Sequence, residues 1–111
     1  MKFSESLKKN KDFQHVYQNG RSAANRYIVM YVLENGTENN RLGISVSKKV
    51  GNSVIRHHLT RLIRESYRLN EEAFQSGLDI VVVLRIRAKE ISYQEAESAL
   101  LHAGRIQGII R

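Results

Sequence analysis

Residues 41–68 read RLGISVSKKVGNSVIRHHLTRLIRESYR, and the fold can be worked out from this stretch. Apolar residues alternate with small or polar ones over residues 41–47, which predicts a half-buried strand. Its other face would consist of Arg41, Gly43, Ser45 and Ser47. Further on, the apolar spacing predicts a helix over residues 53–70, and Asn52 or Ser53 can cap it. The stretch therefore predicts a strand that leads through a short basic loop into a long helix.

The predicted helix over residues 53–70 separates its charged and apolar side chains. At about 100° per residue, its basic and polar side chains share one side: Arg56, His57, Thr60, Arg61, Arg64 and Arg68. The leucines and isoleucines share the other: Ile55, Leu59, Leu62, Ile63 and Leu69. Arg61 and Glu65 form the only favourable charge pair at i, i+4 spacing. A helix selected for stability alone would carry more carboxylates, so this face indicates a polyanionic partner.

The loop before this helix extends the basic surface. It contributes Lys48 and Lys49, and the free backbone N–H groups of the Gly51-Asn52 helix start suit a phosphate. Its spacing is not that of a P-loop. A solvated charged face is the ordinary explanation of such a surface, but a face of that kind mixes both signs of charge. We therefore predict contacts with a polyanion at the polar side chains of the helix and at Lys48, Lys49, Asn52 and Ser53.

The composition favours a nucleic acid as this partner. The 111 residues carry 18 Lys and Arg against 11 Asp and Glu, a net charge of +7, and no Cys. Residues 41–68 hold seven basic side chains against one acidic, and residues 1–26 hold six against two. The absence of Cys excludes a disulfide framework, Cys-ligated zinc and thiol catalysis. We expect one domain over residues 1–111, which binds a polyanion such as nucleic acid.

No stretch predicts insertion into a membrane. The longest apolar run, residues 80–84, is far too short to span a bilayer. The N-terminal residues lack the apolar segment of a secretory signal. We therefore expect a cytoplasmic protein without a membrane partner.

Two more helices are predicted outside the central stretch. Asn10 can cap a short helix that ends at Gly20 in the left-handed cap conformation. One face of this helix would carry Phe13, Val16 and Tyr17. Near the C-terminus, Ser92 and Glu95 have the spacing of a capping box. The helix that follows is expected to bury Ala96, Ala99, Leu100, Ala103 and Ile106.

Strands are predicted on both sides of the central stretch. A β-branched and aromatic run favours a strand over residues 27–33, followed by a turn over residues 34–40. An apolar run over residues 79–86 predicts a strand in the middle of the sheet. A weak signal favours a short strand at residues 21–25. The order α-β-β-α-β-α indicates a small α+β or α/β sandwich.

No catalytic constellation is visible among the side chains. None of the four His residues has the spacing of a zinc site or of a catalytic triad, and no acidic cluster suggests a nuclease centre. His57 and His58 are adjacent on the helix, so they point about 100° apart and do not suit one metal ion. We predict neither catalytic residues nor a metal or other cofactor held by protein side chains.

Residues 45–65 resemble the protein subunit of bacterial ribonuclease P. The family's signature there is a Ser-Val-Ser-Lys-Lys strand end, a Gly-Asn turn, and a helix with an Arg-Asn-Arg core followed by Lys-Arg. The similarity continues through residues 7–13, 20–21 and 24–26 to the last helix, so it covers nearly the whole chain.

The chain departs from the family signature inside the helix. The family's Arg-Asn-Arg reads Arg56-His57-His58 here, and the following Lys reads Thr60. Arg56, together with Arg61 and Arg64, still forms a cationic face.

The resemblance implies a fold and a function. It implies a two-layer α/β sandwich with a four-stranded sheet, three helices and a left-handed β-α-β crossover, of the type shared with a ribosomal-protein domain. The usual handedness rule would have given the opposite crossover. The family's subunit binds a catalytic RNA through the basic helix and assists the endonucleolytic removal of the 5′ leader from precursor tRNA. The RNA carries the chemistry with Mg²⁺, and no obligate protein partner is expected.

The resemblance also implies a cleft for the single-stranded leader between the first helix and the sheet. Its candidate residues are Lys9, Phe13, Tyr17, Tyr31, Arg41 and Ser45. Aromatic platforms in a cationic groove are a common means of binding single-stranded RNA. The three aromatic residues could instead be ordinary core residues.

Three other function classes remain open at this point. A ribosomal or other structural RNA-binding protein would bind ribosomal RNA and leave tRNA processing unaffected. A DNA-binding regulator would require base-reading side chains and usually a dimer surface, and the sequence shows neither a helix-turn-helix pairing nor a heptad seam. A stand-alone nuclease would require the acidic cluster that the sequence lacks.

Overall fold

The strand and the helix predicted from residues 41–70 are both present in the computed structural model, which describes residues 1–111. Strand β4 spans Asn40–Ser45, and helix α2 spans Ser53–Asn70. Asn52 caps α2, because its side-chain oxygen accepts a hydrogen bond of 3.0 Å from the backbone N–H of Ile55. The basic loop therefore leads directly into the first turn of α2, as predicted.

The remaining elements lie on both sides of this unit. Along the chain they are β1 (Ser4–Ser6), α1 (Asn10–Asn19), β2 (Arg21–Ala24), β3 (Ile28–Glu34), then, after α2, the 3-10 turn η1 (Glu71–Ala73), β5 (Leu78–Leu84), the 3-10 turn η2 (Ile86–Ala88) and α3 (Tyr93–Gln107). The predicted capping box starts α3: the hydroxyl of Ser92 accepts from the N–H of Glu95, whose carboxylate accepts from the N–H of Ser92.

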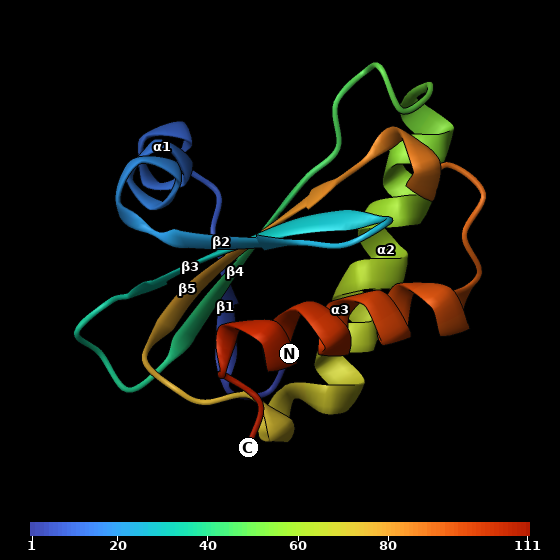
Figure 1. Cartoon of the computed structure of the whole chain (residues 1–111). Helices are drawn as coiled ribbons and strands as arrows, with labels where there is room; N and C mark the ends of the chain where they lie inside the picture. The colour runs from blue at the N-terminus through green and yellow to red at the C-terminus, as the bar shows by residue number, and fades with distance from the viewer.

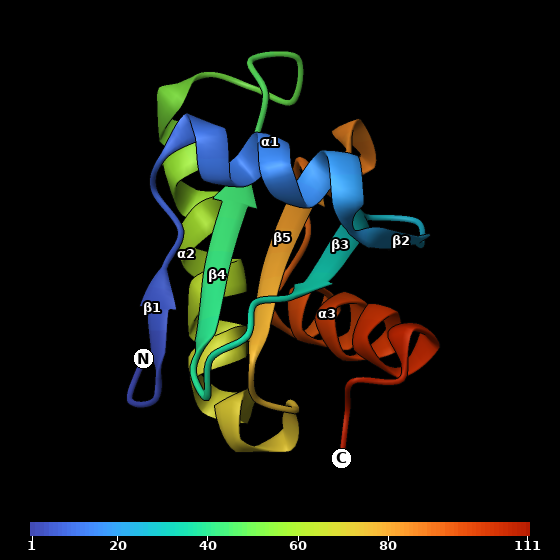
Figure 2. The ribbon, with the colours of Figure 1, turned by 90° about the vertical axis from the view of Figure 1, so that its left-hand side faces the viewer.

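The sheet has five strands in the order β1-β4-β5-β3-β2, where four were expected. β1 was not predicted because its three residues, Ser-Glu-Ser, carry no apolar pattern, and it joins the sheet through parallel pairing with β4. β5 lies in the middle, as predicted. β4 and β5 are parallel neighbours joined through α2. Figure 2, viewed from the α1 side, shows this connection passing behind the sheet from β4 to β5 on its right, which is the left-handed crossover that the resemblance implies.

The two faces of the sheet are covered unequally. α2 and α3 cover one face and form the expected sandwich with it, while α1 lies across the other face and adds a partial third layer (Figure 1). The core between the sheet, α2 and α3 contains 20 buried residues. The cluster under α1 contains three, Leu7, Val16 and Val81. One face is therefore sealed, and the α1 face stays partly open.

Three details predicted for the shorter helices are wrong. Asn10 does not cap α1: it is the first residue of the helix, the N-cap is Lys9, and no side chain forms a cap hydrogen bond. Gly20 follows α1 with φ −81° and ψ 162°, which is extended and not left-handed. A methyl group there would lie 2.7 Å from the carbonyl oxygen of Val16 and 2.9 Å from that of Val32, so a close approach of backbone requires this glycine. Ile106 is 55% exposed, and Gly104 lies on the buried side of α3 with the predicted alanines.

A buried carboxylate fastens the N-terminal segment to the end of α2. The carboxylate oxygens of Glu71 accept hydrogen bonds of 2.9 and 3.0 Å from the backbone N–H groups of Lys2 and Phe3. Burial acts to raise the pKa of Glu71, but hydrogen bonds to its charged form outweigh burial, so the pKa lies below its ordinary value. The hydroxyls of Ser4 and Tyr67, 2.9 Å apart, add a second link. The ionised carboxylate thus holds β1 in the sheet.

We expect Glu71→Gln to lower the free energy of unfolding by about 1–3 kcal/mol, because one of the two acceptors becomes a donor facing an N–H group. A depressed carboxyl pKa stabilises the fold at pH values above the unfolded-state value, near 4.3, and that stability is lost as the pH falls through the folded-state pKa. Urea unfolding from pH 7 to pH 3 should therefore show the two proteins converging at low pH. Glu72→Gln, which changes an exposed neighbour, is the control, and equal effects of both variants would contradict this role.

Candidate nucleic-acid interface

α2 turns one side to the core and a basic side to solvent. Its buried residues are Leu59, Ile63, Ser66 and Tyr67. Among the predicted contacts, His57, Arg61, Arg64 and Arg68 are exposed. Neither Arg61 nor Arg64 forms an ion pair with an acidic side chain. These two guanidinium groups are therefore free for an anionic partner.

The buried stripe of α2 is rotated relative to the predicted one. Arg56 and Thr60, predicted on the cationic face, are half-buried, whereas Leu69, predicted on the apolar face, is 58% exposed. The rotation follows from Tyr67, which the pattern did not count as core and which is fully buried. The hydroxyl of Thr60 donates to the backbone carbonyl of Arg56 at 2.9 Å. Both residues lie at the inner border of the cationic face.

Arg68 is compensated by a neighbouring carboxylate. The predicted pair between Arg61 and Glu65 is absent, and Glu65 instead accepts from Arg68, with a distance of 3.0 Å from Nε to Oε2. This hydrogen bond lowers the pKa of Glu65 below its ordinary value. The guanidinium group of Arg68 presents two N–H donors to the two oxygens of the Glu65 carboxylate. Such a two-donor pair is stronger than a pair joined by one hydrogen bond. Arg68 thus contributes less free charge to α2 than the other exposed arginines.

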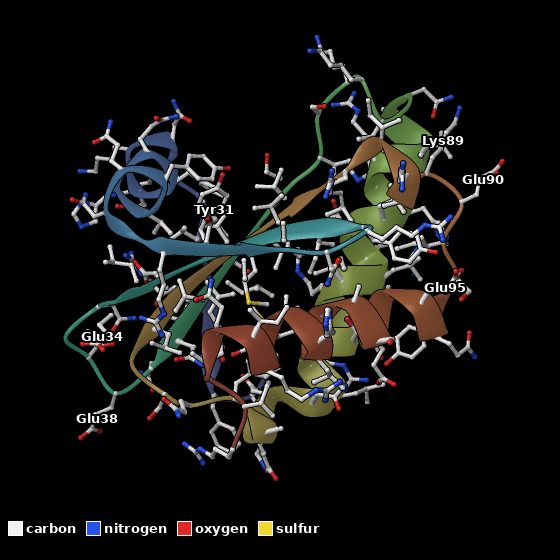
Figure 3. The ribbon with its side chains drawn as sticks, viewed as in Figure 1. Tyr31, Glu34, Glu38, Lys89, Glu90 and Glu95 are labelled. Carbon is white, nitrogen blue, oxygen red and sulfur yellow. The ribbon has the colours of Figure 1, made fainter.

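The loop before α2 and the turn η2 bring more cations to the same end of the molecule. Lys48, Lys49, Asn52 and Ser53 are all exposed, as expected of contact residues. Sequence reasoning missed a second group, the exposed residues Arg85, Arg87 and Lys89 around η2. Figure 3 shows Lys89 beside the first turns of α2 and, at the opposite end, Glu34 and Glu38. The sequence did not point to these cations because residues 69–111 carry five basic side chains against six acidic ones, so that segment has no net positive charge.

The three predicted aromatic residues meet on the α1 side of the sheet. Phe13 and Tyr17 of α1 have ring centroids 6.3 Å apart, and Tyr17 packs edge-on against Tyr31 of β3 at 5.0 Å. A methyl group at Gly43 would lie 2.7 Å from the Phe13 ring, so α1 sits close to the sheet there. All three rings are half-buried and pack on the small cluster under α1. They are neither pure core residues nor free platforms.

A strip of small side chains lies next to this aromatic row. Ser45, Val83 and Val29 are cross-strand neighbours on β4, β5 and β3, and all three are half-buried. They share the face of the sheet on which Tyr31 lies, since β-strand side chains alternate. Lys9 is exposed at the start of α1. The structure therefore places five of the six predicted leader residues around one partly open face.

The sixth, Arg41, is held by Asp79 on the neighbouring strand. Its Nε and Nη2 atoms donate to the two carboxylate oxygens of Asp79 at 2.8 and 2.6 Å, and Asn35 donates to the same carboxylate at 3.0 Å. Burial acts to raise the pKa of Asp79, but these hydrogen bonds outweigh it, and the pKa lies below its ordinary value. Arg41, predicted as a residue of the leader cleft, is thus fixed in place with its charge paired.

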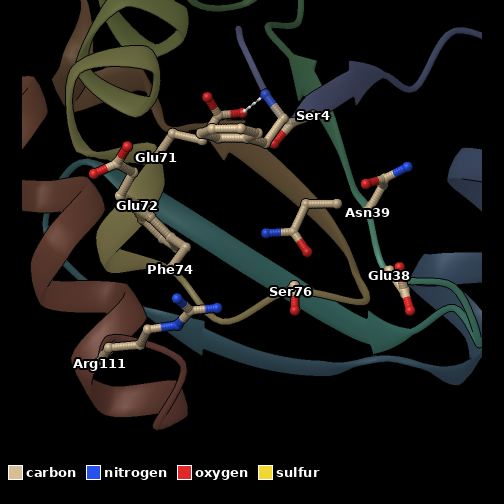
Figure 4. Close-up of a pocket in the computed structure, with 10 residues that line it drawn as sticks. Ser4, Glu38, Asn39, Glu71, Glu72, Phe74, Ser76 and Arg111 are labelled. Atoms are coloured by element: carbon tan, nitrogen blue, oxygen red, sulfur yellow. Dashed lines mark hydrogen bonds between the residues drawn. The ribbon is translucent and has the colours of Figure 1, made fainter.

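The end of the molecule opposite the basic loop is acidic. A hollow of about 500 Å³ is lined there by Glu38, Glu71 and Glu72, with Arg111 as its one cation (Figure 4). This arrangement repels phosphate, so we do not assign this hollow to the interface.

No group of three or more His, Asp or Glu side chains is placed to hold a metal ion. No helix has the length and hydropathy that crossing a membrane requires.

Comparison with known proteins gives one consistent family. The family model described as Ribonuclease P matches residues 1–106. The ribonuclease P protein component of Lachnoclostridium phytofermentans is 59% identical over 107 residues, which are 96% of this chain and 92% of that protein. That of Alkaliphilus metalliredigens is 53% identical over 102 residues, 92% of each chain.

Solved structures agree with the sequence matches. The structure of the RNase P protein of Staphylococcus aureus has a TM-score of 0.89 and 38% identity, covering 97% of this chain and 99% of that one. The RNase P protein from Thermotoga maritima has a TM-score of 0.84 and 32% identity, covering 91% and 96%.

These matches span nearly the whole chain, so they decide among the function classes left open by the sequence. Ribonuclease P is an endoribonuclease that acts in the processing of the tRNA 5′ leader, and its RNA carries out the catalysis. The fold with its crossover and the cationic side of α2 fit a subunit that associates with that RNA. The chain belongs to the ribonuclease P protein family.

Proposed function

We propose that the chain holds two RNA ligands on two different surfaces. The outward side of α2 and the loop before it bind the catalytic RNA, and the partly open α1 face of the sheet binds the 5′ leader of precursor tRNA. The observation that carries the first assignment is the pair of exposed, uncompensated guanidinium groups of Arg61 and Arg64 beside Lys48 and Lys49. Phosphate contacts of this kind supply most of the affinity for a nucleic acid.

The α1 face supports the second assignment by its chemistry. A single strand is bound by stacking its bases on aromatic rings beside a cationic groove. Phe13, Tyr17 and Tyr31 offer partly exposed rings, and the strip of Ser45 and Val83 lets a backbone approach closely. Arg41 is held at the border of this face by its hydrogen bonds to Asp79 and does not act as a mobile phosphate ligand.

The protein assists the reaction by binding. No protein side chain takes part in bond cleavage in this proposal, and Mg²⁺ acts with the RNA partner. The site of action is the cytoplasm, and no further protein is needed for assembly with the RNA. The basic charge of the chain supports this division of roles.

Reconstitution tests the proposal directly. We expect the chain to enhance cleavage of precursor tRNA by a bacterial ribonuclease P RNA at low Mg²⁺ concentration, and to cleave nothing by itself at any Mg²⁺ concentration. Cleavage would be followed by gel analysis of 5′-labelled precursor. RNA-free cleavage that is abolished by a point substitution in this chain would contradict the proposal.

Removing either free arginine of α2 should weaken binding of the catalytic RNA. Arg61→Ala and Arg64→Ala should each lower the log–log slope of affinity against salt by about 0.7–0.9, the loss of one phosphate contact. Arg68→Ala should change the slope less, since Glu65 already compensates that charge. Arg105→Ala, an exposed cation on α3, is the matched control. Unchanged slopes in both α2 variants would show that this helix does not bind the catalytic RNA.

Truncating the aromatic rings should affect leader binding alone. Phe13→Ala and Tyr31→Ala should weaken the affinity of the holoenzyme for precursor tRNA by about 1–3 kcal/mol per lost stack and leave mature tRNA binding unchanged. Thermal unfolding of the same samples is the control, because truncation of a fully buried aromatic residue costs about 3–5 kcal/mol of stability. Equal losses for precursor and mature tRNA, or a stability loss on that scale, would assign the rings to the core.

A further inference from the structure

A groove of about 400 Å³ runs between α2 and the first turn of α3. Its lining residues are His58, Arg61, Leu62, Arg64 and Glu65 of α2 together with Tyr93 of α3. A volume of this size falls within the range of about 300–1,000 Å³ that is usual for small-ligand sites. The groove lies on the cationic side of α2, yet one wall comes from a helix that the sequence did not connect with binding.

Tyr93 is fixed in this groove by a chain of hydrogen bonds. Its hydroxyl donates to Oε2 of Glu97 at 3.0 Å, and the same oxygen accepts from Nδ2 of Asn70 at 2.9 Å. Asn70 also donates to the backbone carbonyl of Ser66 at 2.7 Å, so the chain ends on α2. The ring is half-buried and belongs to neither core cluster. Its position is therefore set before any ligand arrives, which reduces the entropy lost on binding.

The charges on the α2 wall of the groove favour an anion, whereas the Tyr93 hydroxyl itself is bonded to the carboxylate of Glu97. Arg61 and Arg64 have no acidic partner, and the carboxylate of Glu65 is engaged by Arg68. Burial, together with the hydrogen bond to Glu97, raises the pKa of Tyr93, so the ring stays neutral at physiological pH. The groove thus combines an immobilised, uncharged aromatic ring with two free guanidinium groups.

We propose that this groove binds one unstacked nucleotide of the catalytic RNA, with its base against the Tyr93 ring and its phosphate at Arg61 and Arg64. The proposal rests on the assignment of α2 to the catalytic RNA and adds a specific subsite to it. Single-stranded loops and bulges of RNA are commonly recognised through bases that stack on aromatic side chains. A ring on α3 would fix the angle at which α2 meets the RNA, which charges alone do not define.

Stacking and phosphate contacts leave different signatures in a salt series. Loss of a phosphate contact reduces both the affinity and its dependence on salt, because fewer counterions are released. Loss of a stacked base reduces affinity at every salt concentration by the same factor. We expect Tyr93→Leu to weaken binding of the catalytic RNA about tenfold with an unchanged log–log slope. Tyr93→Phe keeps the ring and loses only the hydroxyl bond to Glu97, so it should lose less affinity than Tyr93→Leu.

The experiment measures the affinity of the full chain for a bacterial ribonuclease P RNA across a salt series. Tyr27→Leu is the matched control, because the hydroxyl of Tyr27 likewise donates to a glutamate of α3, Glu95, at 2.8 Å but on another side of that helix. Arg61→Ala in the same series separates the two proposals. If Arg61→Ala lowers the slope and Tyr93→Leu leaves affinity unchanged, the groove proposal alone is overturned. If neither has an effect, α2 itself is not the interface.

Photocrosslinking keeps the proposal testable if Tyr93→Leu fails to fold, which thermal unfolding would reveal. The parent chain would be bound to catalytic RNA that contains 5-iodouridine in its unpaired positions, irradiated, digested and mapped by mass spectrometry. A crosslink at Tyr93 is the expected result. Crosslinks confined to the loop before α2 and to the α1 face would overturn the proposal.

Discussion

The parallel pairing of β4 with β5 is the interaction on which the rest of the structure depends. Its register sets Leu42 beside Ile80 and Ile44 beside Val82, so that large apolar side chains face α2 and α3. A shift of one residue would exchange the two faces of either strand. The pairing also obliges the chain to return from the end of β4 to the start of β5, and α2 is that return. A helix that seals the core on one side presents its opposite side to solvent, and the free arginines lie there.

The arrangement of the elements also separates charge along the molecule. The loop before α2 and the turn η2 lie at one end, where Figure 3 shows Lys89 with Glu90 beside it, while Glu34 and Glu38 lie at the other end. A polyanion is attracted to the first end and repelled from the second, which orients the protein before contact. The acidic end is used for internal structure, since the Glu71 carboxylate binds the N-terminal backbone.

Sequence patterns predicted the parts of this fold that follow from local rules. The bounds of α2, its Asn52 cap, the capping box of α3 and the central place of β5 all depend on neighbouring residues or on one uninterrupted apolar run, and all were confirmed. β1 was missed because it is held by β4 and by Glu71, both far along the chain. The pairing of Arg41 with Asp79 was missed for the same reason, since Asp79 lies on another strand. The residue types of the candidate site could be predicted from the sequence. Which of its cations lack an acidic partner could not be predicted.

The unequal cores explain how the α1 face can stay open. The side toward α2 and α3 buries 20 residues, and it carries most of the hydrophobic stabilisation of the sheet. The α1 side buries three and leaves its aromatic rings half-exposed, an arrangement that stability alone would not select. The ion pair of the half-exposed Arg41 with the buried Asp79 keeps the border of this face rigid without filling it. A surface that binds a flexible strand must expose apolar rings in the absence of the ligand, and only a fold stabilised mainly from its other side tolerates that exposure.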